Sequence, residues 1–94
     1  MKYPTIPVPF KLGRTVATPN VLDTVPQEEI FAALRRHQSC DWGDVSPRDK
    51  WSNDRAVKGR ERLLSVYHSK DGTKFWIITE WDRSATTVLL LSDY

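Results

Sequence analysis

The chain has 94 residues, of which 39% are hydrophobic and 28% are charged, a composition typical of a globular protein rather than a disordered chain. Its formal charge of +2 is far below the strongly basic footprint of dedicated nucleic-acid binders. Cys40 is the single cysteine, which excludes an internal disulfide and a cysteine-rich metal site. No apolar run is long enough to span a bilayer, and prolines interrupt the first residues where a signal peptide needs a continuous apolar stretch. We therefore expect one small domain over residues 1–94, located in the cytoplasm and without contact with a membrane.

The first half of the chain predicts an arm, a strand and two helices. Residues 1–9 alternate proline with apolar side chains, which is typical of an extended N-terminal arm. Residues 10–18 alternate apolar and polar side chains and predict a strand. Residues 26–37 begin with acidic and end with basic side chains around a 3–4 spaced apolar face, which predicts a helix. Residues 47–58 predict a second, more polar helix, because Ser46 is a good cap and a proline follows it.

The second half of the chain, residues 62–91, predicts a three-stranded antiparallel meander. Asp71-Gly72 is a strong hairpin signal, and Asp82-Arg83 is the corresponding break before the last strand. The middle strand is apolar on both faces at residues 75–78, as expected for a central strand. The predicted fold class is therefore α+β, with an antiparallel sheet of about four strands packed against two helices.

Two-residue turns at both hairpins would fix the register of the meander and hence the two faces of the sheet. The first predicted face carries Leu64, Val66, Phe75, Ile77, Val88 and Leu90, with Arg62, Thr79, Trp81, Ser84 and Thr86 at one end. The second predicted face carries Leu63, Ser65, Tyr67, Trp76, Ile78, Glu80, Ala85, Thr87 and Leu89. Arg62 and Glu80 are thus expected on opposite faces. Tyr67 and Trp76 would be exposed together if the helices cover the first face, which predicts a homodimer through this surface.

The polar end of the meander is the first candidate site. Its catalytic candidates are Arg62, Glu80, Asp82 and Arg83, and its binding candidates include Arg62, Trp81, Arg83, Ser84 and Thr86. Arginines that hold a phosphate beside a carboxylate that accepts a proton are the groups that metal-free RNA cleavage needs. Alternatively, the charged groups form surface ion pairs and the threonines are ordinary strand residues.

The loop over residues 40–44 is the second candidate site. Trp42 is either a hydrophobic plug between the two helices or a contact for a base or a protein partner. Asp41 and Asp44 lie near His37, and the three side chains suggest a general base or a metal site. The alternative is that His37 stabilises the end of its helix as a cation. We expect no metal and no cofactor.

Three sequence motifs carry a resemblance to a known family: RRHQSCDWGD, GRERLLSVY and WIITEWDRSATTVLL. Together they cover nearly the whole chain, and they resemble a family of small bacterial proteins found on plasmids, prophages and other mobile elements. The CDWGD stretch corresponds to a GDWGD-like motif of that family. The resemblance implies a mobile-element setting and no particular activity.

A looser likeness covers residues 26–91. Helices followed by an antiparallel meander, with an arginine opening one strand and polar residues at the last hairpin, are similar to the barnase and RelE class of small ribonucleases. This likeness implies that Arg62 binds phosphate and that Asp82-Arg83 lies where such enzymes place a catalytic residue. The last hairpin has no histidine, which departs from their pattern.

We expect the chain to act by binding a host or mobile-element protein, as anti-restriction and anti-CRISPR inhibitors do, rather than as an enzyme. This class needs no catalytic group and suits the four tryptophans as contact residues. Two alternatives stay open: an RNA-directed toxin or ribonuclease, and a non-catalytic module that binds RNA or DNA. The basic run Arg55, Lys58, Arg60 and Arg62 favours the last alternative, although acidic residues interrupt it.

Overall fold

The computed structural model describes residue 4 and residues 7–94, and most of the predicted arm over residues 1–9 lies outside these described residues. Four strands form one sheet in the order β1-β4-β3-β2. They are β1 (Arg14–Ala17), β2 (Leu63–His68), β3 (Lys74–Thr79) and β4 (Ala85–Leu90). The helices are α1 (Pro19–Thr24), α2 (Gln27–Gln38) and α3 (Pro47–Gly59), and the short 3-10 helix η1 (Leu91–Asp93) follows the last strand. The predicted α+β class, four strands and two main helices are confirmed.

The sheet is mixed, and this corrects the prediction of an antiparallel sheet. β2, β3 and β4 form the predicted antiparallel meander, but β1 pairs with β4 in parallel. A parallel neighbour needs a long connection, and here the chain from α1 to β3 provides it. The strand predicted over residues 10–18 is shorter than expected, because Gly13 adopts a φ of +66° just before β1 begins.

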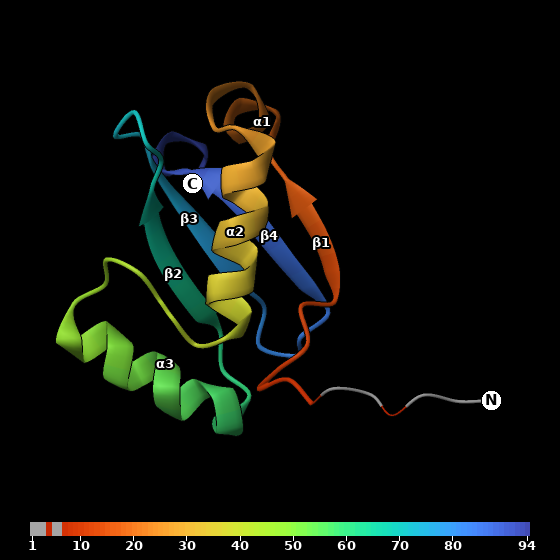
Figure 1. The fold of residues 1–94 in the computed structure, drawn as a ribbon. Coiled ribbons are helices and arrows are strands. Elements are labelled where there is room, and N and C mark those ends of the chain that lie inside the picture. The colour runs from red at the N-terminus through yellow and green to blue at the C-terminus, as the bar shows by residue number, and fades with distance from the viewer. Residues whose placement is uncertain (1–3, 5–6) are drawn as a thin grey trace.

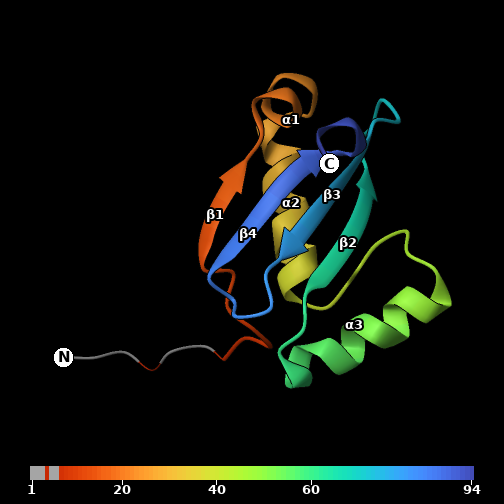
Figure 2. The same cartoon turned by 180° about the vertical axis from the view of Figure 1, so that it is seen from behind.

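Among the described residues, a helix covers only one face of the sheet. α2 lies across it in Figure 1, and from behind, in Figure 2, the strands lie in front of α2 with no helix over them. α3 lies beside the β2 end of the sheet instead of joining α2 on the same face. We call the side facing α2 the inner face and the opposite side the outer face. No helix in the described part of the chain is both long and apolar enough to cross a membrane.

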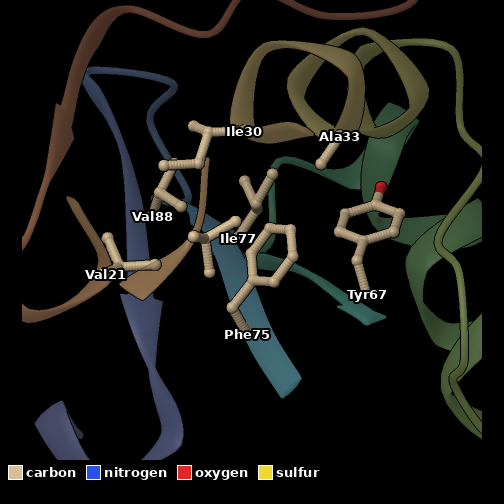
Figure 3. Close-up of a cluster of buried hydrophobic side chains, with 8 residues drawn as sticks. Val21, Ile30, Ala33, Tyr67, Phe75, Ile77 and Val88 are labelled. Carbon is tan, nitrogen blue, oxygen red and sulfur yellow. The ribbon is translucent and has the colours of Figure 1, made fainter. Parts of the chain in front are cut away.

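The main core lies between α2 and the inner face. Figure 3 shows its side chains, and the buried members of this cluster are Val21, Val25, Ile30, Ala33, Tyr67, Phe75, Ile77 and Val88. A second, smaller core joins α3 to the sheet through Phe10, Trp42, Ala56 and Leu63. Asn53 anchors α3 in addition, because its amide donates to the Leu64 carbonyl at 2.7 Å and its oxygen accepts from the Leu64 amide at 3.2 Å. α3 therefore covers the edge of β2, where unpaired backbone groups would otherwise remain.

The two helix starts differ in how closely they follow the prediction. Ser46 caps α3 by accepting from the Asp49 amide, as predicted, and Pro47 begins the helix. α2 begins at Gln27, one residue later than predicted, and has no side-chain cap. At the end of α3, Arg60 takes the left-handed conformation, with a φ of 58°.

The register of the second hairpin is confirmed, and the register of the first is wrong by one residue. Thr79 lies opposite Thr86 and Ile77 opposite Val88, as predicted. Ser65, and not Val66, lies opposite Ile77. The last paired residues of β2 and β3 are His68 and Lys74, so the connecting loop has five residues instead of the predicted two. A one-residue shift moves every side chain of β2 to the other face.

This shift rearranges the predicted faces. Leu63, Ser65 and Tyr67 lie on the inner face, while Leu64 and Val66 lie on the outer face beside Trp76 and Ile78. The predicted pairing of Tyr67 with Trp76 on one exposed face is therefore wrong. Tyr67 is buried in the core, where its hydroxyl donates to the Asp41 carbonyl at 2.7 Å. Self-association of the chain stays a prediction that now depends on Trp76 alone.

Candidate functional site

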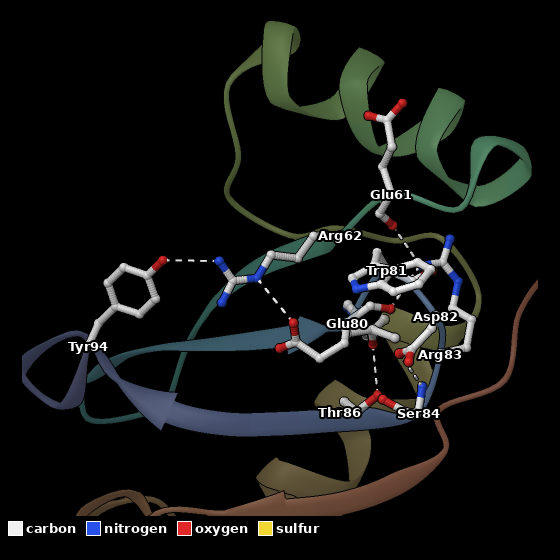
Figure 4. A network of polar contacts seen from close by, with 11 residues as sticks. Glu61, Arg62, Glu80, Trp81, Asp82, Arg83, Ser84, Thr86 and Tyr94 are labelled. Atoms are coloured by element: carbon white, nitrogen blue, oxygen red, sulfur yellow. Dashed lines mark hydrogen bonds and ion pairs between the residues drawn. The ribbon is translucent and has the colours of Figure 1, made fainter.

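Arg62 and Glu80 meet on the outer face, at the end of the sheet where β2 begins. Their side chains were expected on opposite faces, and the register shift brings them together. The Nε atom of Arg62 lies 3.9 Å from Oε1 of Glu80, and both side chains are partly exposed. Arg62 also donates through Nη1 to the hydroxyl of Tyr94 at 3.1 Å (Figure 4). One arginine thus contacts a carboxylate and a phenol on an open surface.

A shallow hollow of about 250 Å³ lies next to this arginine. Its lining consists of Arg62, Leu64, Trp76, Ile78 and Tyr94. The ring of Tyr94 packs edge-on against Trp76, with the ring centroids 5.3 Å apart. The hollow is therefore apolar on its floor and aromatic on its wall, with a guanidinium at its rim.

Arg83 is tied to the backbone around it, and its expected role in binding phosphate stays a prediction. Its Nη1 donates to the carbonyls of Glu61 at 2.6 Å, Glu80 at 3.1 Å and Trp81 at 3.3 Å. Its Nη2 donates to the carbonyl of Ala56 at 2.7 Å. These bonds join the β3–β4 turn to the end of α3 (Figure 4). The guanidinium thus links the turn to the end of α3, because its Nη1 and Nη2 atoms both donate to backbone carbonyls.

The other residues of the β3–β4 turn are exposed. The Ser84 amide donates to Oδ1 of Asp82 at 3.0 Å, and hydrogen bonds from Ser84 hold the pKa of Asp82 below its usual value. Asp82 is therefore a turn-forming carboxylate that is ionised at neutral pH. Trp81 is 60% exposed and presents the largest side chain of the turn to solvent.

Thr86 is fully buried, so it cannot contact a ligand as predicted. It belongs to a chain of polar side chains on the inner face, formed by Ser65, His37, Thr79 and Thr86, all without exposed surface. His37 Nδ1 contacts the Ser65 hydroxyl, and Nε2 lies 2.8 Å from the Thr79 hydroxyl. Thr79 and Thr86 are 2.7 Å apart, and Thr86 donates to the Leu12 carbonyl at 2.7 Å. We call this the buried hydroxyl chain.

The loop candidates do not form a common site. Trp42 is 2% exposed, its ring packs against Phe10 and its Nε1 donates to Asp54, which confirms the plug and contradicts a contact surface. Asp41 pairs with Arg36 at 2.7 Å, and this hydrogen-bonded guanidinium lowers the pKa of Asp41. Asp44 pairs with His68 at 3.0 Å on the surface.

His37 meets neither loop aspartate, because it points into the protein. It therefore neither caps its helix as a cation nor forms a site with these carboxylates. Burial lowers the pKa of His37 to about 4, with a further contribution from the charge of Arg83. Across residue 4 and residues 7–94, no group of three or more histidine, cysteine or acidic side chains is placed to hold a metal ion.

Two parts of this picture were not found from the sequence. Tyr94 was not singled out, because nothing in its short terminal segment indicates that η1 folds it back onto Trp76. The buried hydroxyl chain left a signal, since Ser65, Thr79 and Thr86 interrupt apolar strand positions in three neighbouring strands. Polar side chains at such positions need a partner when they are buried.

Taken together, the exposed groups at this end of the outer face are residue types suited to binding. They comprise a guanidinium, carboxylates, a phenol and an exposed indole, while the histidine suited to proton transfer is enclosed in the core. Comparison of the chain with protein-family models, with curated proteins and with solved structures finds no match.

Proposed function

We propose that this chain is a small cytoplasmic binding protein of a bacterial mobile element that inhibits or redirects a host or element protein. The single observation that carries the proposal is the exposure of three side chains, Trp81, Arg62 and Tyr94, which Figure 4 shows together. Trp81 is 60% and Tyr94 68% exposed. Tryptophan, tyrosine and arginine are the residue types that dominate the binding energy of protein interfaces.

The same observations weigh against an RNA-cleaving enzyme. In that alternative Arg83 would help Arg62 to hold a phosphate, but its Nη1 and Nη2 atoms already donate to backbone carbonyls. Glu80 is the only carboxylate within ion-pair distance of Arg62 among the described residues. A second phosphate ligand and a histidine acid are both lacking from this group.

The two most exposed tryptophans provide a matched test. Trp81 and Trp51 are each 60% exposed, but Trp51 lies on α3 where Arg55 packs over its ring at 4.8 Å. Tagged protein is used to capture partners from host lysate, and the affinity for any captured protein is then measured with purified components. We expect Trp81→Ala to weaken binding about 30-fold or more, as at an interface hot spot, and Trp51→Ala to leave it unchanged.

An equal loss with both variants would show that the polar end of the outer face is not the contact surface. A growth arrest accompanied by RNA cleavage, abolished by Arg62→Ala, would instead overturn the proposal in favour of the ribonuclease alternative. RNA integrity in expressing cells is therefore measured beside the capture experiment.

A further inference from the structure

The hollow on the outer face has an apolar floor made by two facing strands. Leu64 and Ile78 lie directly opposite each other in the β2–β3 register, and both line the hollow. Trp76 and Tyr94 rise on one side of this floor, and Arg62 lies at the rim. The volume of about 250 Å³ is below the usual range for drug-sized ligands and cofactors. A single apolar side chain fits this space better than a large ligand.

Arg62 keeps most of its hydrogen-bonding capacity for a ligand. A guanidinium has five N–H donors, and Arg62 uses one of them on Tyr94. The distance of 3.9 Å to Glu80 is too long for a hydrogen bond, so that contact is only an ion pair across a half-exposed surface. A carboxylate approaching from solvent can therefore form the two parallel hydrogen bonds that arginine favours.

The indole of Trp76 offers a second donor. Its Nε1 atom is buried, yet it has no hydrogen-bond acceptor among the described residues. The ring of Tyr94 packs against this indole, at an interplanar angle of 60°. Buried polar groups are normally paired, and this unpaired N–H belongs to a residue that lines the hollow.

Tyr94 shows which groups suit this surface, an aromatic ring beside an oxygen atom that accepts a hydrogen bond. Its aromatic ring contacts Trp76, and its oxygen accepts a hydrogen bond from Arg62 (Figure 4). Its side chain is nevertheless 68% exposed, so it leaves room for a second group over Leu64 and Ile78.

We propose that the hollow binds an aromatic or branched apolar side chain of the partner protein that stands next to a carboxylate. The apolar group lies on Leu64 and Ile78, and the carboxylate binds Arg62 in place of Glu80. This inference rests on the proposed function and specifies the recognition chemistry of the same surface.

The smallest probe with both groups is N-acetyl-phenylalanine, and N-acetyl-phenylalaninamide is its uncharged match. Binding is followed through the indole N–H signals of ¹⁵N-labelled protein, with Trp76→Phe used to assign the Trp76 signal. We expect the acid to shift this signal saturably and the amide to bind roughly threefold or more weakly, as suits one exposed ion pair. Arg62→Gln should remove the preference for the acid. Glu80→Gln should strengthen binding of the acid, because the competing carboxylate is gone.

Arg55→Gln is the matched control, since Arg55 also packs over an aromatic ring, that of Trp51 on α3, but does not line the hollow. It should leave both affinities unchanged. An unmoved Trp76 signal, equal binding of acid and amide, or a preference that survives Arg62→Gln would each overturn the inference. Capture of a partner that depends on Trp81 would then still uphold the proposed function. A Trp76 response without any captured partner would uphold the hollow as a site and overturn the proposed function.

Discussion

His37 is enclosed between α2 and the sheet, and its hydrogen-bond partners determine which of its nitrogens carries the proton. Thr86 donates to the Leu12 carbonyl, so its oxygen accepts from Thr79. Thr79 then accepts from His37 Nε2, which leaves Nδ1 to accept from Ser65. Each donor has one acceptor only if the imidazole is neutral, which agrees with a pKa lowered to about 4 by burial.

This arrangement predicts a pH dependence of folding stability. The unfolded chain binds a proton at His37 near pH 6.5, whereas the folded protein does so only near pH 4. The unfolded state thus holds more protons between these values, and the free energy of unfolding must fall as the pH falls through this window. The loss is up to about 3 kcal/mol, because each pKa unit corresponds to about 1.4 kcal/mol. Denaturant unfolding between pH 4 and pH 7 measures it.

His37→Gln should flatten this dependence, because glutamine does not titrate. At neutral pH the variant should be less stable by about 1–3 kcal/mol, since Ser65 or Thr79 loses its partner. His68→Gln is the matched control, because His68 is exposed, and it should keep the slope. A slope that persists unchanged in His37→Gln would contradict the assignment.

At the scale of the elements, turn chemistry decided which predictions held. The second hairpin kept its predicted register without a glycine, because Arg83 itself takes a left-handed φ of 60° and its side chain fixes the turn. The first hairpin has the stronger signal, Asp71-Gly72, but Ser69 pairs its amide with the Thr73 carbonyl and widens the loop. Side-chain bonds of Ser69 and Asp71 stabilise this wider loop. Such local bonding competes with a tight turn, and periodicity alone could not reveal it.

Gly13 controls how β1 joins the sheet, and this can be tested. A Cβ at Gly13 would lie 2.3 Å from the Arg83 carbonyl oxygen and 2.5 Å from that of Ser84. The Arg14 amide, one residue on, donates to the Ser84 carbonyl at 3.0 Å, so the strand cannot move away without losing this bond. We therefore expect Gly13→Ala to destabilise the protein by more than the ~1–2 kcal/mol of the left-handed conformation alone.

Gly72→Ala separates the cost of the left-handed backbone conformation from the cost of the steric clash. Gly72 also has a positive φ, of +90°, but a Cβ there would meet nothing within 4 Å. Its substitution should cost only the conformational part, measured by the same denaturant unfolding. An equal loss at both positions would show that the close approach of Gly13 to the β3–β4 turn is unimportant.

At the scale of the whole molecule, the sequence was sufficient for the element types and insufficient for the site. Helices and strands follow from local periodicity, capping and turn residues, all of which can be read from neighbouring positions. The site depends on contacts across the chain, such as Arg62 with Tyr94 and Arg83 with Ala56. These contacts follow from the register of β2 and from the path of η1, and a one-residue change in either would separate the groups.

The charge distribution predicts weak binding to polyanions, which bears on the nucleic-acid alternative. The net charge is only +2, and on α3 Lys50 is paired with Asp54 at 2.9 Å while Arg55 packs over Trp51. The 12 acidic side chains repel a phosphate backbone and offset most of the attraction of the 14 basic ones. We expect elution from heparin by roughly 0.15 M salt, with a salt dependence of about two or three phosphate contacts.

A comparison of two exposed arginines shows whether that binding is localised. Arg55 lies on the basic run of α3, and Arg35 lies on α2 outside it. A diffuse charge effect requires Arg55→Gln and Arg35→Gln to lower the elution salt equally, because each removes one positive charge. A selective effect of Arg55→Gln, combined with a steep salt dependence, would reveal a phosphate-binding patch on α3. The protein-partner proposal would then give way to a nucleic-acid-binding module, because that patch would lie on α3 and not on the open sheet face.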